Sequence, residues 1–290
     1  MIWNLGSINV DNFYHLSHLP VAGETLAALR YHKGLGGKGA NMSVAAARAA
    51  ARVAQIGAVG QDGGWTVQRL LEYGVDTRHI AEVSAPTGHA NIHIDAQGEN
   101  NIVLVPGANQ EITVAMIGAA LSEASAGDFL LMQNETSGQA YAAKVGKTLG
   151  LRLAYAAAPF SAESVQAILG QIDLLMLNAV EAEQLAAATG QRIEDFPVDD
   201  IVITLGADGA RHVSNKAKTD ISIPAYRIDA VDTTGAGDTF SGYLVAGLDR
   251  GMPMADAIDL AMRAGALMVA REGTADVIPD LKEIQDHEFS

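Results

Sequence analysis

One stretch of sequence decides how the rest of the chain is interpreted: Asp232-Thr233-Thr234-Gly235-Ala236-Gly237-Asp238-Thr239-Phe240-Ser241-Gly242. Tyr226, Ile228 and Val231 precede it and an apolar pattern follows it, which predicts a strand end, a glycine turn and a helix start. Glycines leave the N–H groups of the turn uncovered, and a helix start adds unpaired donors and a positive dipole end. The turn is therefore a candidate anion site. Asp238 beside it could take a hydroxyl proton while the amides hold phosphate charge, which suits phosphoryl transfer.

A structural interpretation of Asp238 competes with this chemistry. Aspartate before an apolar run is a common helix N-cap, which contributes about 1 kcal/mol of stability. The same helix start would stabilise the ionised carboxylate in either case. The choice between the two therefore depends on the rest of the chain.

Length and composition predict a globular protein with a sizeable core. The chain has 290 residues, of which 49% are apolar and 18% charged, which fits one large α/β domain or two smaller ones. A net charge of −15 argues against a nucleic-acid partner, which would need a basic face. An anionic small substrate stays open because nearby donors outweigh the overall charge at short range. Since cysteine is absent, no disulfide framework or thiolate chemistry is expected.

The first residues are predicted to form a strand and not a signal peptide. Residues 1–6 carry no basic segment, and Asn4, Asn9 and Asp11 interrupt any apolar run. No stretch approaches the roughly 20 apolar residues of a membrane span. We therefore expect a cytoplasmic protein without a membrane partner.

Polar residues follow the first predicted strand, Ile2 to Ile8. If the strand continues, Asn9 and Asp11 face the same way, at the end of the strand where α/β sheets bind ligands. An Asx turn that leaves the strand is the alternative. Thr25 to Lys33 is predicted as a further strand, followed by a glycine-rich turn that opens an alanine-rich helix.

That turn matches the dinucleotide pattern G-x-G-x-x-G only by the spacing of its glycines. Its sequence is Gly34-Leu35-Gly36-Gly37-Lys38-Gly39-Ala40-Asn41. The acidic residue expected about 20 positions on is missing, and a Walker A loop fails because Gly39 follows Lys38. What remains is a flexible turn with one lysine and one asparagine, either a hinge or a cradle for a hydroxyl-rich ligand.

The middle of the chain predicts a small separate sheet. His89 to Asp95 and Asn101 to Val105 alternate around a glycine turn and are predicted to form a β-hairpin. From residue 112 onward, strands and helices alternate. We therefore predict a doubly wound α/β/α sandwich over residues 1–290 as a single domain, with a β-sheet lid built from strands near 12–34 and 88–106.

Two strand ends in the second half also carry polar or glycine clusters. Asn178 and Glu181 lie three apart across a helix start, where they could share a hydrated cation or form a capping arrangement. The segment from Gly206 to Gly209 is a second glycine turn at a strand end, followed by a predicted hairpin to Ile223.

Taken together, six clusters resemble the PfkB-type sugar kinases of the ribokinase-like fold, most closely the ribokinases within that family. The clusters cover nearly the whole chain in the family's order: Gly6 to Asp11, Gly36 to Asn41, Leu131 to Glu135, Asn178 to Glu181, Thr204 to Gly209 and Asp232 to Gly242. The resemblance implies ATP-dependent phosphorylation of a primary hydroxyl of a small sugar, with ribose converted to ribose 5-phosphate as the leading candidate.

The resemblance also implies roles for individual residues. Asp238 matches the base for the acceptor hydroxyl, and the backbone amides of Gly235, Ala236 and Gly237 match the anion hole. The positions that match sugar contacts are Asn9, Asp11, Gly37, Lys38, Asn41 and Glu135, together with Asp238. The positions that match the nucleotide and phosphate side are Asn178, Glu181, Thr204, Gly206, Gly209 and Gly237.

Metal ions are implied in the same way. Glu181 matches a Mg²⁺ site reached through water. Asp232 and Thr234, with the backbone near Arg271 and Gly273, match a monovalent-cation site, so K⁺ is expected beside ATP and Mg²⁺.

The chain departs from the family pattern at three places. Ala156-Ala157-Ala158-Pro159 stands where an Asn-Pro-Ala-Pro-like turn is usual, and Tyr243 stands where a small residue is usual. Arg263 lies on the helix that faces the adenine pocket, or is only a surface residue. These differences bear on which sugar is used and leave the catalytic set intact.

Several alternatives remain open at this point. A kinase of the same fold could act on fructose, keto-deoxy-gluconate, inositol or a nucleoside. Against a nucleoside, only 5% of residues are aromatic, and Tyr14, Tyr31 and His32 are the candidates near the lid to stack a base. A non-catalytic sugar or nucleotide sensor and an NAD-dependent oxidoreductase fit less well. The edges of the lid strands also suggest a homodimer through the lid.

Overall fold

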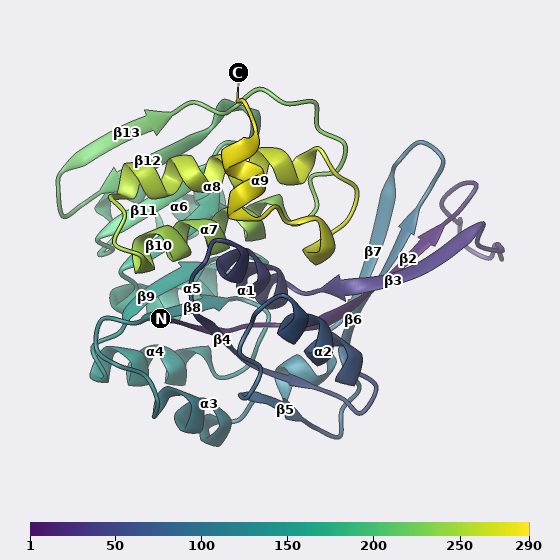
Figure 1. The fold of residues 1–290 in the computed structure, drawn as a ribbon, viewed down its shortest axis with the longest axis horizontal. Coiled ribbons are helices and arrows are strands. Elements are labelled where there is room, and N and C mark those ends of the chain that lie inside the picture. Colours follow the sequence, from purple (N-terminus) through teal and green to yellow (C-terminus); the bar gives the residue numbers. More distant parts are fainter. Residues whose placement is uncertain (290) are drawn as a thin grey trace.

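A nine-stranded sheet runs through the centre of the protein, whose computed structural model describes residues 1–289 (Figure 1). In spatial order its strands are β13 (Thr219–Ile223), β12 (Ala210–Ser214), β11 (Asp200–Thr204), β10 (Leu174–Asn178), β9 (Arg152–Ala156), β8 (Phe129–Gln133), β1 (Ile2–Leu5), β4 (Val53–Val59) and β5 (Ile80–Glu82). The strands from β11 to β5 are parallel, and β12 and β13 are antiparallel. The chain winds from β1 toward β5 in one direction and from β8 toward β13 in the other, so the topological switch point lies between β1 and β8.

Helices cover both faces of this sheet, which confirms the doubly wound α/β/α sandwich. One apolar core lies under α1 (Lys38–Arg48), α2 (Gly64–Glu72), α7 (Ala236–Asp249), α8 (Met254–Val269) and α9 (Leu281–Asp286). A second core lies on the opposite face under α3 (Val114–Leu121), α4 (Gln139–Thr148), α5 (Ala162–Ile168) and α6 (Ala179–Thr189). Within residues 1–289, no helix combines the length and the apolar content needed to cross a membrane.

A four-stranded sheet projects from one side of the layered body (Figure 1). Its order is β3 (Arg30–Gly36), β2 (Asn9–His15), β6 (Gly88–Ile94) and β7 (Asn100–Val105), and we call it the lid sheet. The predicted β-hairpin is confirmed as the antiparallel pair β6 and β7.

Three predicted strand boundaries were wrong. The strand predicted from Thr25 begins only at Arg30, because its partner β2 ends at His15, opposite Arg30. The first strand stops at Leu5, since the chain then crosses from the large sheet to the lid sheet, where Asn9 starts β2 as a strand and not as an Asx turn. Residues 224–232 form no strand before the glycine turn at residues 233–237, which we call the anion turn. There, the N–H groups of Val231 and Asp232 both donate to the carbonyl of Val269, which ties this segment to the end of α8.

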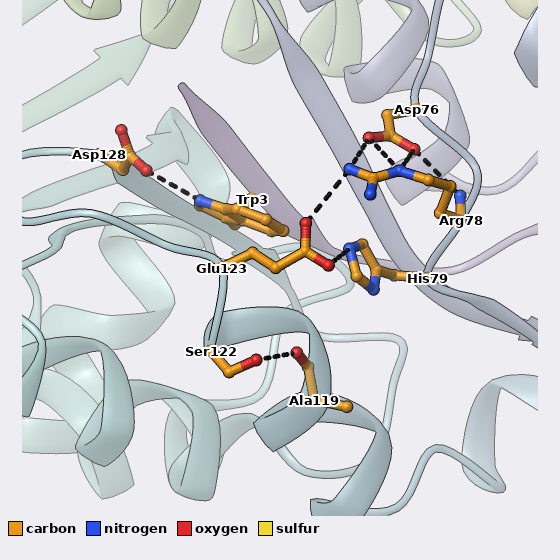
Figure 2. A network of polar contacts seen from close by, with 8 residues as sticks. All are labelled: Trp3, Asp76, Arg78, His79, Ala119, Ser122, Glu123 and Asp128. Atoms are coloured by element: carbon orange, nitrogen blue, oxygen red, sulfur yellow. Dashed lines mark hydrogen bonds and ion pairs between the residues drawn. The ribbon is translucent and has the colours of Figure 1, made fainter.

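A polar network joins loops near the amino ends of the strands (Figure 2). Glu123 lies between Arg78 and His79, 3.3 Å from a guanidinium nitrogen of Arg78 and 3.6 Å from Nε2 of His79. The indole Nε1 of Trp3 donates to Asp128 at 3.0 Å. These contacts hold the segment before β5 against the segment after α3. They lie at the opposite end of the strands from the polar clusters of the sequence, so the network supports the fold.

Candidate active site

Asp238 occupies the first turn of α7, beside the switch point between β1 and β8. It is 7% exposed, and the Nδ2 of Asn41 donates to its Oδ2 at 2.9 Å. The Nζ of Lys38 lies 3.9 Å from its Oδ1. The charge of Asp238 is the main cause that raises the pKa of Lys38, and burial opposes it. The structure therefore joins the start of α1 to the start of α7 around one carboxylate.

Glu135, which follows β8, closes the other side of Lys38. Its Oε2 accepts a hydrogen bond from the backbone N–H of Lys38 at 3.2 Å and another from the hydroxyl of Ser7. Burial raises the pKa of Glu135, and its hydrogen bonds and the charge of Lys38 only partly offset this effect. Ser7 was not singled out from the sequence, although it lies inside the cluster Gly6 to Asp11.

Asp11 is the most perturbed acid of the site. It lies on β2 and is 7% exposed. Burial, followed by the charges of Glu135 and Asp238, raises the pKa of Asp11 to about 7, and Lys38 acts in the opposite direction. A buried carboxyl group with so perturbed a pKa marks a candidate functional site.

Asn9 is held by a residue that the sequence did not point to. The Nδ2 of Asn109 donates to Asn9 Oδ1 at 2.8 Å, and Asn109 Oδ1 accepts from the backbone of Ile8 at 2.9 Å. Asn9 also lines a cavity of about 110 Å³ that it shares with Glu135, under the β7 residue Leu104.

The glycine-rich turn has a packing role. Gly37 has φ of 91°, and a Cβ on it would lie 2.8 Å from the backbone nitrogen of Asn9. A Cβ on Gly36 would overlap the carboxylate of Asp11. These glycines let the end of β3 and the start of α1 approach the polar start of β2, which accounts for the spacing that imitates a dinucleotide pattern.

A cavity of about 220 Å³ lies on the other side of Asp238. It brings together several predicted residues of both halves, among them Lys38, Asn178, Glu181, Thr204, Gly235, Gly237 and Asp238. Ala156, one of the departures from the family pattern, also lines it. The predicted base therefore stands at the mouth of a space lined by the predicted nucleotide side.

Of the three amides matched to the anion hole, two are free in this conformation. Gly235 has φ of 76° and is the N-cap of α7. The N–H of Ala236 donates to Thr233 at 3.2 Å, whereas within residues 1–289 the N–H groups of Gly235 and Gly237 have no hydrogen-bond partner. The N–H groups of Gly235 and Gly237 are thus free, whereas that of Ala236 is engaged by Thr233.

Asn178 and Glu181 form a complete capping box at the start of α6. Glu181 Oε2 accepts from the N–H of Asn178 at 2.8 Å, and Asn178 Oδ1 accepts from the N–H of Glu181 at 2.9 Å. Burial is the main cause that raises the pKa of Glu181, which nevertheless lines the large cavity. The capping role and a role toward phosphate or cation are therefore compatible.

Gly206 and Gly209 do not line this cavity. They bound the turn Gly206–Asp208 between β11 and β12. Gly209 has φ of 104°, and a Cβ on it would overlap the carbonyl of Ile223. The hairpin alone thus requires Gly209, and the neighbouring Thr204 is the residue of this cluster that reaches the cavity.

Asp232, Thr234 and Gly273, for which a cation site is predicted, lie next to one another. Asp232 Oδ1 accepts from the N–H of Thr234 at 2.9 Å, and its Oδ2 accepts from the N–H of Gly273 at 3.3 Å. The side chain of Arg271 points away, to Glu283 at 2.8 Å. Residues 1–289 contain no group of three or more His, Cys, Asp or Glu side chains that could hold a metal ion directly.

The two large side chains that depart from the family pattern are explained by packing. The hydroxyl of Tyr243 is buried and donates to the carbonyl of Pro279 at 2.5 Å. Arg263 pairs with Asp259 at 2.9 Å and stacks on Tyr226 and Phe289. Both support the fold around α7 and α8.

Comparison with known proteins agrees with this arrangement. The family model described as pfkB family carbohydrate kinase matches residues 2–281. The ribokinase of Haemophilus influenzae is 37% identical over 294 residues, which cover 96% of this chain and 95% of that protein. The crystal structure of ribokinase from Cryptococcus neoformans var. grubii in complex with ADP has a TM-score of 0.86 and 30% identity, over 98% of each chain. Arabidopsis thaliana ribokinase complexed with ribose and ATP has a TM-score of 0.84 and 25% identity, over 98% of this chain and 97% of that one. The chain therefore belongs to the pfkB family of carbohydrate kinases and has the ribokinase-like fold.

Proposed function

We propose that the protein transfers the γ-phosphoryl group of ATP to the primary hydroxyl of ribose and so produces ribose 5-phosphate. One observation carries this proposal. Buried Asp238 stands between the acids Asp11 and Glu135 and the 220 Å³ cavity, with Lys38 and Asn41 in contact with it. The ribokinase relatives, and the ribokinase solved with ribose and ATP, support this substrate pair.

In the proposed reaction, the hydroxyl oxygen forms a bond to the γ-phosphorus while the bond from that phosphorus to the ADP oxygen breaks. Asp238 accepts the hydroxyl proton as the new bond forms. The N–H groups of Gly235 and Gly237, joined by that of Ala236 once it leaves Thr233, stabilise charge on the transferring group. Lys38 contributes positive charge beside the carboxylate. Alignment and charge stabilisation supply most of the acceleration in reactions of this class.

The proposed sugar is neutral. Asp11, Glu135, Asp238 and Glu181 surround the single cation Lys38, whose pKa they all raise. An anionic sugar would add charge to an already negative site, whereas hydroxyl groups would donate to the carboxylates. Asn9, Gly37 and Asn41 complete the proposed sugar contacts. Asn41 Oδ1 is buried without a partner among residues 1–289, so it can accept a hydrogen bond from a sugar hydroxyl. Keto-deoxy-gluconate is accordingly a poor candidate.

The residues present fit Mg²⁺ held through water at Glu181 and by the phosphates of the nucleotide. Mg²⁺ keeps several waters and does not need an all-protein cage, so a single acid at the cavity suffices. What bound Mg²⁺ supplies is neutralisation of charge on the phosphate oxygens. Asn178 and Thr204 complete this side, and Gly206 and Gly209 shape the turn behind it.

We assign a K⁺ site to Asp232, Thr234 and Gly273, which lie beside the anion turn. Both carboxylate oxygens of Asp232 accept backbone N–H groups, and each keeps lone pairs for a cation. Activity that stays flat across a K⁺ titration from a K⁺-free buffer would contradict this assignment.

A nucleoside is the alternative substrate, because the lid sheet carries an aromatic stack that the sequence did not predict. Phe13 and His32 stack with ring centroids 4.7 Å apart, and His32 also stacks on His15 at 5.5 Å. By strand alternation, Phe13 and His15 share the face of β2 that carries Asn9 and Asp11. A base attached to the sugar would meet this stack.

Further properties of the protein belong to the same proposal. Residues 1–290 act as one kinase domain in the cytoplasm, and the lid sheet closes over the sugar. Two copies pair through the exposed edges of the lid sheet, so a monomeric mass at micromolar concentration would contradict the dimer.

A screen of ADP release with Mg-ATP and K⁺ tests the substrate. The panel holds ribose, deoxyribose, fructose, keto-deoxy-gluconate, myo-inositol, adenosine, cytidine and uridine. Turnover is expected with ribose and absent with keto-deoxy-gluconate. Turnover with a nucleoside and not with ribose would favour the alternative. Silence across the panel would mean either a polyol outside the panel or a non-catalytic sensor.

A further inference from the structure

We infer that Thr274 is a positioning residue that couples sugar binding at the lid sheet to the anion turn. The inference rests on the proposed function, because it takes sugar and nucleotide as the two ligands. Thr274 is buried, and its hydroxyl donates to the carbonyl of Leu35 at 2.9 Å. Leu35 is the β3 residue directly before Gly36 and Gly37, which pack against Asp11 and Asn9. The loop after α8 is thus tied to the sugar side of the lid sheet.

The same loop is tied to the anion turn through the preceding residue. Gly273 donates its N–H to Asp232 Oδ2 at 3.3 Å, and Asp232 Oδ1 accepts the N–H of Thr234 at 2.9 Å. Thr234 directly precedes Gly235, whose N–H has no hydrogen-bond partner among residues 1–289. Three hydrogen bonds therefore connect β3 to the anion turn through Thr274, Gly273 and Asp232.

The two ends of this loop are fixed by other contacts. Arg271 donates to Glu283 in α9 at 2.8 Å, and Asp276 accepts from Arg69 in α2 at 2.8 Å. The residues between these anchors are the part of the loop able to follow a displacement of β3. Because this part of the loop is short and hydrogen-bonded at both sides, it passes a displacement of β3 to Asp232 and does not absorb it.

Sugar that orders β3 would therefore also order the turn that receives the phosphate, and nucleotide would order β3 in return. Thermodynamic linkage requires the effect to be reciprocal, and couplings of this kind change affinity by about 5–150-fold. An exposed contact between Arg30 and Glu272 at 3.4 Å runs parallel to the relay, but its charges are screened by solvent. The buried hydroxyl of Thr274 is the decisive link.

The test measures the Kd of ADP by calorimetry with and without saturating ribose. In the wild type we expect ribose to tighten ADP binding by about tenfold. In Thr274→Val, which keeps the shape and removes the hydroxyl, the ratio should fall below about twofold, while each ligand alone keeps its affinity within about threefold. Thr274→Ser keeps the donor and should restore the wild-type ratio.

The matched control is Thr66→Val. Thr66 is also buried and its hydroxyl donates to a carbonyl, that of Gly63 at 2.7 Å, at the start of α2. This variant should keep the wild-type coupling despite a similar loss of stability. Wild-type coupling in Thr274→Val, an equal loss in Thr66→Val, or absence of coupling in the wild type would overturn the inference. Binding of ribose alone is titrated first. If ribose does not bind, the result counts against the proposed substrate and not against the relay. The ratio of the ADP Kd values without and with sugar is then measured with the sugar of the panel that binds.

Discussion

The proposed sugar side and the proposed phosphate side of the site are built in opposite ways. On the sugar side, buried side chains of Asn9, Asp11 and Asn41 are held by other side chains and by close backbone packing. On the phosphate side, the anion turn and the nearby Asp232 and Asn178 are exposed or half-buried and rely on backbone groups. The difference indicates that the proposed sugar contacts on β2 and α1 are preformed, whereas β3 and the loops proposed to receive the phosphate can adjust.

A layer of three buried amide side chains and one serine hydroxyl under the proposed sugar side, which we call the amide layer, makes the contrast sharper. It consists of four fully buried side chains that hydrogen-bond one another: Asn4, Ser43, Gln55 and Gln133. Asn4 donates to the carbonyl of Gly39 at 2.8 Å, and Gln55 donates to that of Gly6 at 2.7 Å. Buried polar groups are costly unless they are paired, so such a layer fixes geometry at the expense of stability. No comparable layer lies beneath the anion turn among residues 1–289.

The largest expected effect comes from Asp238, which belongs to both sides. Asp238→Asn removes the proton acceptor but keeps the size of the side chain, so kcat should fall about 10²–10⁴-fold. Steady-state ADP release at saturating ribose and Mg-ATP measures it. Asp256→Asn is the control, since Asp256 is also an acid in the first turn of a helix, α8. An Asp238→Asn enzyme within about tenfold of wild type would contradict the role of base.

The next effect concerns stability on the sugar side. The pKa of Asp11 is about 7 in the folded protein against 3.8 for the ordinary carboxyl. Its ionised form therefore destabilises the fold, and stability from this group falls as the pH rises from about 4 to above 7. Asp11→Asn should stabilise the ligand-free protein at pH 8, by an upper limit of about 4 kcal/mol, and leave it unchanged near pH 4.

Urea unfolding at both pH values measures this gain, and ribose binding should weaken in the same variant. Equal stability of Asp11→Asn and wild type at pH 8 would show that the ionised carboxylate of Asp11 does not destabilise the fold.

A smaller loss is expected when the amide layer is interrupted. Gln55→Met preserves length and leaves the carbonyl of Gly6 and the hydroxyl of Ser43 without their partners, which should cost about 1–3 kcal/mol. We also expect KM for ribose to rise while KM for ATP stays constant, because only the sugar side depends on this layer. Gln68→Met on the surface of α2 is the control and should change stability by less than about 0.5 kcal/mol. A change in KM for ATP alone would contradict the claim that only the proposed sugar side depends on the amide layer.

The smallest effect is expected on the phosphate side. Glu181→Gln retains a capping box, because glutamine also accepts the N–H of Asn178. It removes the charge proposed to hold hydrated Mg²⁺, so KM for Mg-ATP should rise by about tenfold or less. Titration of Mg-ATP at saturating ribose measures it. A rise in KM for ribose instead would contradict the assignment of Glu181 to the phosphate side alone.

Much of the arrangement was predictable because strand ends carry the site. The clusters at Asn9, Lys38, Glu135 and Asp238 follow or precede elements whose periodicity is plain, and parallel strands place such ends at one edge. Ser7 and Asn109 were missed as partners of Glu135 and Asn9, since those contacts join residues 128 and 100 positions apart.

The errors have physical causes of the same kind. The stack of Phe13 and His32 depends on the register of β2 against β3, which periodicity does not fix. The strand predicted before the anion turn is absent because Val231 and Asp232 bond to the end of α8 and not to a sheet. The amide layer was invisible for a further reason: each member sits alone in an apolar context, and only the fold brings them into contact.

Identification of the product is the most direct test of the central claim, that the protein phosphorylates the primary hydroxyl of ribose. Wild-type protein is incubated with ribose, Mg-ATP and K⁺, and the products are followed by phosphorus NMR. We predict stoichiometric formation of ADP and ribose 5-phosphate. Phosphate on another hydroxyl, or ADP formed only with inorganic phosphate, would contradict the account.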